Sequence, residues 1–286
     1  RRPRRSTARM AGPADSRRWG VLDGARGGDG SHRDVTSRRG KIAPMQSAAF
    51  ARPIMFHYTP AMSCPYVEGR TERRLVADIG GPRSGRAHDK LATIGFRRTQ
   101  NLIYRPACPS CSACVPVRIR VDDFQWSKGF RRSLKRNQDV VGELRPSATT
   151  HEQYELFRAY QQNRHNGSEM SHMTRTDFDD MVERSPIDSR LVEYRARATG
   201  ALLAVMLSDL QADGLSAVYS FFRQDCADRG LGTFMILDLV RRARARGRPY
   251  VYLGYWIAES RKMAYKTRYK PCEVFRDGRW QEYIGA

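Results

Sequence analysis

The chain has 286 residues and a formal net charge of +21, so a neutral or acidic surface is excluded and a polyanionic partner is expected. Nucleic acid is the leading candidate because phosphate contacts release counterions, and the alternative is a generally Arg-rich, solvated surface. No apolar run is long enough to span a membrane and no secretory signal peptide is evident, so we expect a cytoplasmic protein without a membrane partner.

Residues 1–44 differ in composition from the rest of the chain. They hold 12 Lys and Arg against 4 Asp and Glu, and they are rich in Gly and Ser but poor in aliphatic residues. Such a segment cannot bury enough apolar surface to order itself, so we predict a disordered basic extension. An organelle transit peptide is the alternative, although the segment shows no clear apolar face.

The next segment, 45–145, is predicted to be a strand-rich domain that contains the clustered cysteines. Cys108, Cys111 and Cys114 have C-x2-C-x2-C spacing, and Cys64 supplies a fourth thiol upstream. Two-residue gaps let thiolates converge on one centre, so these four residues could bind Zn or an Fe–S cluster. A redox or vestigial set, or simple packing of reduced thiols, is the alternative.

Two further elements are predicted in this segment. Apolar residues alternate from Val115 to Val121, the period of a half-buried strand, and Pro116 favours an edge or a bulge for it. A short helix over 127–137 would carry one cationic face, because its basic residues recur at helical spacing without acidic partners. This face could follow a phosphate backbone, and the alternative is a solvated surface. The basic residues are Lys128, Arg131, Arg132, Lys135 and Arg136.

Residues 146–286 show a different pattern of apolar residues and turn signals. We predict two helices capped by Thr149 and Thr176, then an antiparallel meander over 191–196, 201–207 and 216–222. A strand–helix–strand unit follows, with a Gly-containing loop at 229–233, a helix to about 246 and a strand over 250–256. The chain closes with a short helix around 260–266 and a hairpin that turns at Asp277-Gly278.

This order resembles the GNAT acyltransferase fold, in which backbone amides at the helix start bind a phosphate-bearing acyl donor. Gly230 and Gly232 fit the loop pattern of that fold, whereas Ala227 stands where the pattern has Gln or Arg. A coenzyme A donor is therefore not supported by the loop. The predicted fold class is α+β, with a cysteine-containing strand-rich domain followed by a GNAT-like domain.

Several longer runs occur in one order along the chain: Cys64–Tyr66, Gly95–Arg98, Tyr104–Cys114, Arg136-Asn137, Asp213–Phe221, Leu231–Thr233 and Tyr252–Ile257. Together these runs resemble the bacterial aspartate/glutamate leucyltransferases, which are relatives of the eukaryotic arginyl-tRNA–protein transferases. The resemblance covers about residues 50–286.

The resemblance implies transfer of leucine, or of arginine as in the relatives, from charged tRNA to proteins that begin with Asp or Glu. The added residue would mark those proteins for degradation. The ester of a charged tRNA is already activated, so transfer needs no cofactor, and the sequence has no Gly-x4-Gly-Lys-[Ser/Thr] nucleotide loop. The alternatives are a GNAT-like acetyltransferase that uses acetyl-coenzyme A and a metal-stabilised RNA-binding module without catalysis.

Candidate site residues follow from their places in the predicted transferase domain. Tyr219, Ser220 and Tyr255 are candidates near the reacting carbonyl, although core packing is the more frequent role for a single tyrosine. The basic helix would bind the tRNA. A cationic side chain must also bind the acidic side chain of the acceptor. The candidate substrate-binding residues are Arg105, Gly232, Thr233, Trp256, Lys262 and Lys266.

Overall fold

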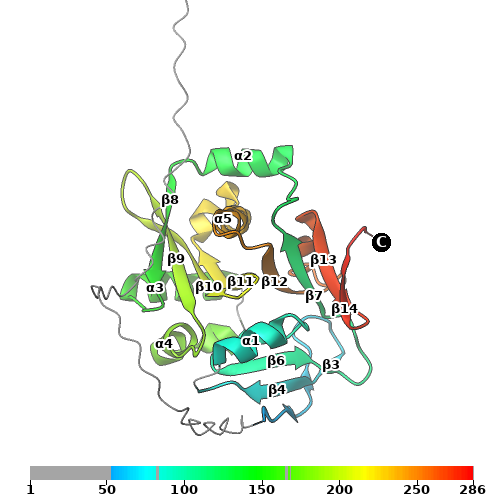
Figure 1. Cartoon of the computed structure of the whole chain (residues 1–286). Helices are drawn as coiled ribbons and strands as arrows, with labels where there is room; N and C mark the ends of the chain where they lie inside the picture. Colours follow the sequence, from blue (N-terminus) through cyan, green and yellow to red (C-terminus); the bar gives the residue numbers. More distant parts are fainter. Residues whose placement is uncertain (1–52, 82–83, 165–166, 168, 286) are drawn as a thin grey trace, which may run out of the picture. The chain divides into compact units, whose positions relative to one another are not determined.

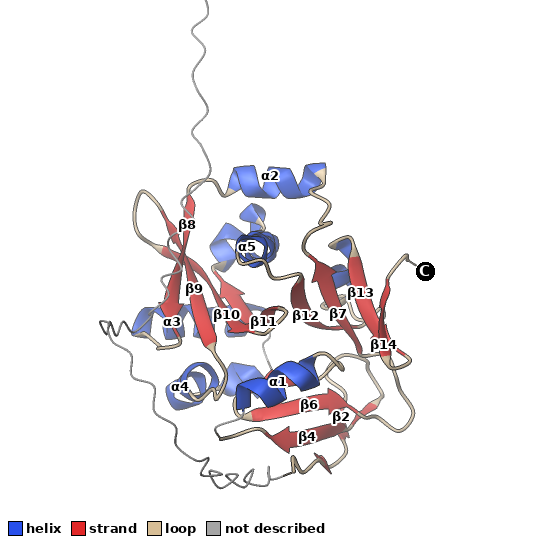
Figure 2. Ribbon diagram, viewed as in Figure 1, coloured by secondary structure: helices blue, strands red, loops and turns tan. Residues whose placement is uncertain are grey.

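The alternating strands predicted for residues 191–222 lie at the centre of a large mixed sheet. The computed structural model describes residues 53–286 apart from 82–83, 165–166, 168 and 286, so the expectation for residues 1–44 lies outside them. In this described part the largest sheet has eight strands (Figures 1 and 2). In spatial order they are β14 (Arg279–Glu282), β13 (Cys272–Arg276), β7 (Val115–Arg120), β12 (Tyr250–Trp256), β11 (Gly214–Phe222), β10 (Leu202–Leu210), β9 (Ser189–Ala196) and β8 (Val140–Pro146).

The pairing confirms the predicted meander and the strand–helix–strand unit. Strands β9, β10 and β11 pair antiparallel in sequence order, and β12 adds to β11 in parallel after the crossover through α5 (Leu231–Ala245). The final hairpin also forms, because Asp277 and Gly278 both adopt the positive φ that a tight turn between β13 and β14 requires.

Strand β7 lies inside the sheet, so the edge position predicted as one alternative is wrong, whereas the other alternative, a bulge, is found in its pairing with β12, where the register shifts beside Val117. It pairs with β12 on one side and β13 on the other. Its pairing with β13 covers Val117 to Ile119 only, so Pro116 lies just beyond the paired residues on that side. The missing proline N–H is tolerated there because the neighbouring strand does not require a donor at this position.

Helices cover both faces of the large sheet (Figure 1). Alternate residues of β10 point to opposite sides: Met206 packs into the apolar cluster built on α5, and Val205 packs with Phe157 and Phe178 on the other side. The helices are α1 (Ser84–Ala92), α2 (Lys128–Arg136), α3 (His151–Arg164), α4 (Arg175–Glu183) and α5, with short 3-10 turns η2 (Glu169–His172), η3 (Gln224–Arg229) and η4 (Ala264–Arg268).

Both predicted helix caps are displaced by one or two residues. Helix α3 begins after Thr150, whose hydroxyl accepts from the backbone N–H of Gln153 while the Gln153 side chain accepts from the Thr150 N–H. Helix α4 is capped by Thr174 with Asp177 in the reciprocal position. Each true cap starts a Thr-x-x-Gln/Asp pattern, so the shorter Asp and the neutral Gln serve as well as Glu in the box.

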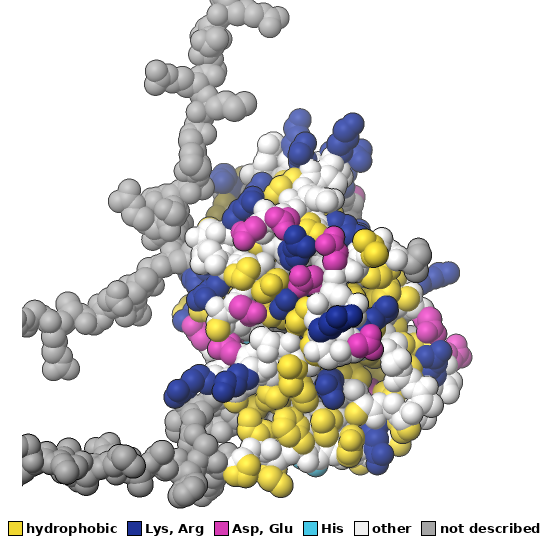
Figure 3. Space-filling model, turned by 45° about the vertical axis from the view of Figure 1, so that its right-hand side comes forward, with side chains coloured by type: hydrophobic (Ala, Val, Ile, Leu, Met, Phe, Trp, Pro, Cys, Tyr) yellow, Lys and Arg dark blue, Asp and Glu magenta, His cyan; other side chains and the backbone are white. Residues whose placement is uncertain are grey.

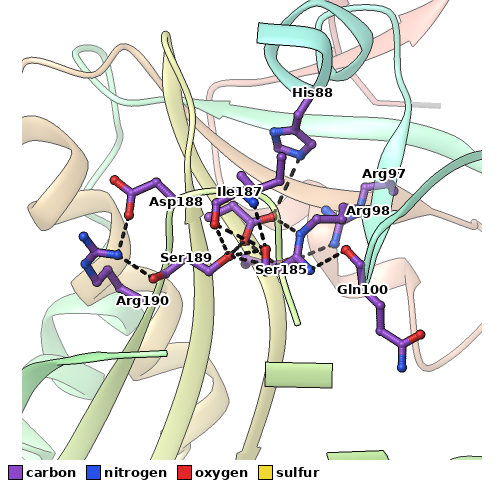
Figure 4. A network of polar contacts seen from close by, with 11 residues as sticks. His88, Arg97, Arg98, Gln100, Ser185, Ile187, Asp188, Ser189 and Arg190 are labelled. Atoms are coloured by element: carbon purple, nitrogen blue, oxygen red, sulfur yellow. Dashed lines mark hydrogen bonds and ion pairs between the residues drawn. The ribbon is translucent and has the colours of Figure 1, made fainter. Parts of the chain in front are cut away.

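A smaller sheet from the first part of the chain packs against the large one. Its order is β1 (His57–Tyr58), β4 (Arg74–Asp78), β6 (Leu102–Pro106) and β5 (Arg97–Thr99), and β2 (Met62–Ser63) pairs separately with β3 (Thr71–Glu72). A buried ion pair connects the two sheets: Arg98 donates from Nε and Nη2 to the two carboxylate oxygens of Asp209 at 2.7 Å each (Figure 4). Ser189 donates to the same carboxylate, and His88 lies 3.8 Å from it.

The boundary expected between residues 145 and 146 falls within the paired residues of β8 and β9. Strands β7 and β8, from the expected first domain, therefore belong to the same sheet as the expected second domain. None of the helices in the described part of the chain has the length and apolar character that crossing a bilayer requires.

Candidate active site

The candidate catalytic residues lie on β11 and β12, beyond the point where these strands stop pairing. The parallel register joins Gly214 to Tyr250 and ends with Ser216 opposite Tyr252. Among the described residues no further pairing joins the two strands, although β11 continues to Phe222 and β12 to Trp256. Residues 217–222 of β11 remain paired with β10, and residues 254–256 of β12 remain paired with β7. Because 217–222 of β11 and 253–256 of β12 no longer pair with each other, we call them the unpaired strand ends.

Tyr219 lies on the unpaired end of β11, and its hydroxyl is oriented by a neighbour. The side-chain amide of Gln161, from α3, donates to the Tyr219 hydroxyl. Burial raises the pKa of Tyr219 well above its usual range, so the phenol stays protonated near neutral pH. Since Gln161 supplies the donor of that bond, the proton of Tyr219 remains available for an oxygen in the site. Ser220 follows on the same strand and is half-buried opposite Met206.

Tyr255 is buried on the unpaired end of β12 and is engaged in the fold. Its hydroxyl donates toward the backbone carbonyls of Gly95, in the turn before β5, and of Tyr104 on β6, at 3.0 and 3.2 Å. Burial raises its pKa well above the usual range. Tyr255 therefore anchors the smaller sheet to β12, which is the structural role expected for many buried tyrosines.

Lys266 brings a buried ammonium group to the same strand. Its side chain is 8% exposed, and Nζ donates to the backbone carbonyl of Tyr255 at 2.7 Å. Burial first, and then the positive charge of Arg97, lower the pKa of Lys266 from 10.5 to about 7. Lys262, four residues earlier, is exposed.

Arg97 contacts both unpaired strand ends. Its Nη2 donates to the carbonyl of Ala217 on β11 at 3.0 Å. On β12 the guanidinium lies against Gly254, where a Cβ atom would come within 2.8 Å of the Arg97 Cζ atom. Gly254 has a φ of 81°, so this position requires glycine for its backbone and for the space that the guanidinium fills.

The other candidate substrate residues surround the start of α5 and the end of β12. Gly232 lies in the first turn of α5 and packs near the ring of Phe222, and the Thr233 hydroxyl accepts from Arg268. Trp256 is buried at the end of β12, where its ring lies 4.9 Å from that of Tyr283.

The four predicted cysteines line one pocket of about 400 Å³. Arg105 lies in the same wall, with its guanidinium 5.2 Å from the centre of the Phe96 ring. A hydrogen bond from the backbone N–H of Ala113 and another from Arg70 lower the pKa of the Cys111 thiol. Burial and the neighbouring thiols raise the pKa of Cys114 to about 12.

These thiols surround the pocket without forming a ligand set. In the described residues no group of three or more His, Cys, Asp or Glu side chains is arranged to hold a metal ion. Arg70 Nη1 lies 3.1 Å from the Cys111 sulfur, which places a cation against one of the proposed ligands. Zn or Fe–S binding at Cys64, Cys108, Cys111 and Cys114 stays a prediction, and no step described below depends on it.

The predicted basic helix forms as α2. Its five cationic residues, Lys128 and the four that follow it at helical spacing, are all exposed, and Phe130 anchors the helix by stacking on Tyr269 at 5.2 Å. Arg136 also contacts the carbonyl of Asp228, just before the start of α5. Figure 3 shows Lys and Arg side chains projecting at the end of the molecule where Figure 1 places α2.

Sequence reasoning assigned no role to Arg97 and Gln161. Arg97 belongs to the Gly95–Arg98 run that carried the family resemblance, but its contacts with β11 and β12 come from pairing between distant segments. Gln161 is buried in the last turn of α3 beside Tyr219. Its place one residue after Tyr160, on the helix face that carries Phe157, was the available signal, because buried amides require partners.

Comparison with known proteins places the chain in a family. Residues 152–276 match the family model "Arginine-tRNA-protein transferase, C terminus", and residues 62–132 match the corresponding N-terminus model. A relative from Paramagnetospirillum magneticum, named aspartate/glutamate leucyltransferase, is 47% identical over 232 residues, which cover 81% of this chain and 95% of the relative. A protein of the same name from Rhodospirillum rubrum is 48% identical over 237 residues, 82% of this chain and 96% of the relative.

Among solved structures, L-PGS from Bacillus licheniformis is similar at 13% identity, covering 51% of this chain and 47% of that one with a TM-score of 0.41. This likeness is distant. The sequence matches define an aminoacyl-tRNA–protein transferase, an enzyme class. The chain belongs to the aspartate/glutamate leucyltransferase family.

Proposed function

We propose that this protein transfers leucine from leucyl-tRNA to the α-amino group of proteins that begin with Asp or Glu, and so marks them for degradation. The single observation that carries the proposal is the identity of 47–48% to aspartate/glutamate leucyltransferases over nearly their whole length. The basic surface of α2 and the net charge of +21 suit a tRNA donor. Since charged tRNA is the donor, the expected location is the cytoplasm.

The proposed reaction is a direct transfer. The neutral amine of the acceptor attacks the ester carbonyl of leucyl-tRNA, an amide bond forms, and the ribose hydroxyl leaves with a proton while the amine loses one. Proximity and a donor to the oxyanion can supply much of the acceleration. Tyr219 suits the donor role, because Gln161 fixes its oxygen and leaves its proton free. Ser220 lies one residue further, whereas Tyr255 would support the site through its bonds to the smaller sheet.

We assign the two parts of the chain different tasks. Residues 45–145 would supply the tRNA-binding helix and the wall against β12, and residues 146–286 would form a GNAT-like transfer domain. The parallel β11–α5–β12 unit supports the GNAT-like assignment, since strands that stop pairing beside a helix start leave room for an acyl group. Gly232 and Thr233 would then face the ester-bearing end of the tRNA.

The test is a transfer assay with defined components. The full chain is incubated with leucyl-tRNA or arginyl-tRNA and a peptide that starts with Asp, and the product is weighed by mass spectrometry. A mass increase of one leucine from leucyl-tRNA, without ATP, is the expected result. Transfer of an acetyl group from acetyl-coenzyme A would support the acetyltransferase alternative. RNA affinity without any transfer would support a binding module.

A further inference from the structure

The half-buried guanidinium of Arg97 and the buried ammonium of Lys266 both lie beside the unpaired strand ends. Arg97 reaches this place from β5 and Lys266 from η4, and the charge of Arg97 acts directly on the Lys266 ammonium. Like charges that share a buried site repel each other and lose hydration. Such a pair is stable only where another interaction offsets both costs.

The hydrogen bonds of Arg97 are incomplete. One nitrogen, Nη2, is satisfied by the Ala217 carbonyl. The other terminal nitrogen, Nη1, is buried and has no hydrogen-bond partner among the described residues. Buried donors in native proteins are almost always paired, so this N–H points to a group that the described residues do not supply.

Nor does the described part of the chain supply a counter-charge. Lys266 donates to a neutral carbonyl, and the only other charge-bearing groups found to influence it are Arg97 and the Cys114 thiol. The neighbouring Arg98 is a useful contrast, because its Nε and Nη2 both donate to the carboxylate of Asp209 at 2.7 Å. Arg98, which connects the two sheets, is paired with a carboxylate of the same chain, whereas Arg97 has no carboxylate partner among the described residues.

We propose that Arg97 and Lys266 form the site that reads the acidic side chain of the acceptor's first residue. The inference rests on the proposed function and names the residues that would decide its specificity. A carboxylate would accept from the free Nη1 of Arg97 and neutralise the pair of cations. An Asn or Gln side chain would leave both charges uncompensated, which explains why an acidic residue is required.

The position of the pair favours the acceptor carboxylate over a tRNA phosphate. Arg97 bonds the backbone carbonyl of Ala217 on the unpaired end of β11, the strand that also carries Tyr219. The α-amine of Asp or Glu is only two or three carbons from its carboxylate carbon, so a carboxylate held by Arg97 keeps the amine near this strand end. Phosphates of a large polyanion suit the exposed cations of α2 better than a buried pair.

The decisive measurement is acceptor selectivity of Arg97→Gln in the full chain. For wild type and variant, kcat/KM is measured with leucyl-tRNA and two matched peptides that start with Asp or Asn. We expect Arg97→Gln to lower kcat/KM for the Asp peptide at least 100-fold and for the Asn peptide by less than threefold. Arg97→Lys keeps a charge and should retain part of the preference. Arg73→Gln, an exposed arginine before β4, is the matched control and should behave as wild type.

Equal losses for both peptides would overturn the inference, since a structural or tRNA-binding role lowers all rates together. The thermal midpoint and leucyl-tRNA affinity of each variant are measured alongside. If Arg97→Gln does not fold, the same ratio measured for Lys266→Met decides the question. If wild type transfers no leucine at all, the proposed function fails, and the site is judged by binding: an Asp peptide that binds wild type and Arg97→Gln equally would refute it.

Discussion

Replacing Lys266 by Met should raise the free energy of unfolding while impairing transfer to peptides that start with Asp. The pKa of Lys266 falls from 10.5 in the reference state to about 7 in the fold. At about 1.4 kcal/mol per pKa unit, this corresponds to a cost of roughly 5 kcal/mol for keeping the ammonium charged in place. Methionine removes that cost but leaves the Tyr255 carbonyl without its donor, a loss of about 1–2 kcal/mol. We therefore expect the free energy of unfolding at pH 7 to rise by about 3 kcal/mol.

The pH dependence gives an independent check of the sign. Above pH 7 the folded protein holds Lys266 mainly neutral, whereas the unfolded chain keeps it protonated until about pH 10.5. The unfolded state then binds more protons, so the stability of wild type should increase with pH between these values. Lys266→Met should lack this increase.

The assay is urea unfolding of the full chain at pH 7 and pH 9.5. Lys262→Met is the control, because Lys262 is exposed and its replacement should change stability by less than about 0.5 kcal/mol. The reasoning is refuted if Lys266→Met is less stable than wild type at pH 7 and if wild type gains nothing between the two pH values. Lys266 would then be a well-compensated structural residue. Greater stability together with lost transfer to Asp peptides is the pattern expected of a functional buried charge.

Three further predictions concern separate parts of the molecule. The double variant Arg131→Ala/Arg132→Ala should bind tRNA more weakly, and each lost phosphate contact should reduce the slope of log K against log salt by about 1; an unchanged slope would mean that α2 is only a solvated surface. Asp209→Asn should cost about 3–5 kcal/mol in urea unfolding because it leaves the buried guanidinium of Arg98 unpaired, and a loss below about 1 kcal/mol would contradict this. Gly254→Ala should cost about 2 kcal/mol through its φ of 81° and a contact of 2.8 Å with a guanidinium carbon, and it should slow transfer; normal stability and rate would show that this packing is dispensable.

Local patterns were sufficient for the elements that form from neighbouring residues. The meander of β9, β10 and β11 follows from alternating apolar residues and short turns, and α5 follows from a Gly-containing loop and an apolar face. The same information located α2 and its exposed cations. These features depend on spacing along a single segment, so the sequence alone contains what determines them.

The interior position of β7 could not be read from its own residues. Pro116 argues locally for an edge, yet Val115 pairs with Trp256 across a long stretch of chain. Pairing between distant segments depends on the whole arrangement of the core and overrides local preference. The helix caps could not be located to the residue for a different reason. More than one Thr residue lies near each helix start, and the folded structure selects Thr150 and Thr174 as the N-cap residues.

The contrast between Arg97 and Arg98 follows from the same non-local geometry. Both residues lie on the three-residue strand β5, and their identical side chains give the sequence no means of separating them. Pairing of β5 with β6 brings one to the Asp209 carboxylate and the other to a neutral carbonyl beside a second cation. A fold gains nothing in stability from two neighbouring cations that have no counter-charge. Their presence side by side, next to the unpaired ends of β11 and β12, is understandable if the missing anion arrives with a substrate.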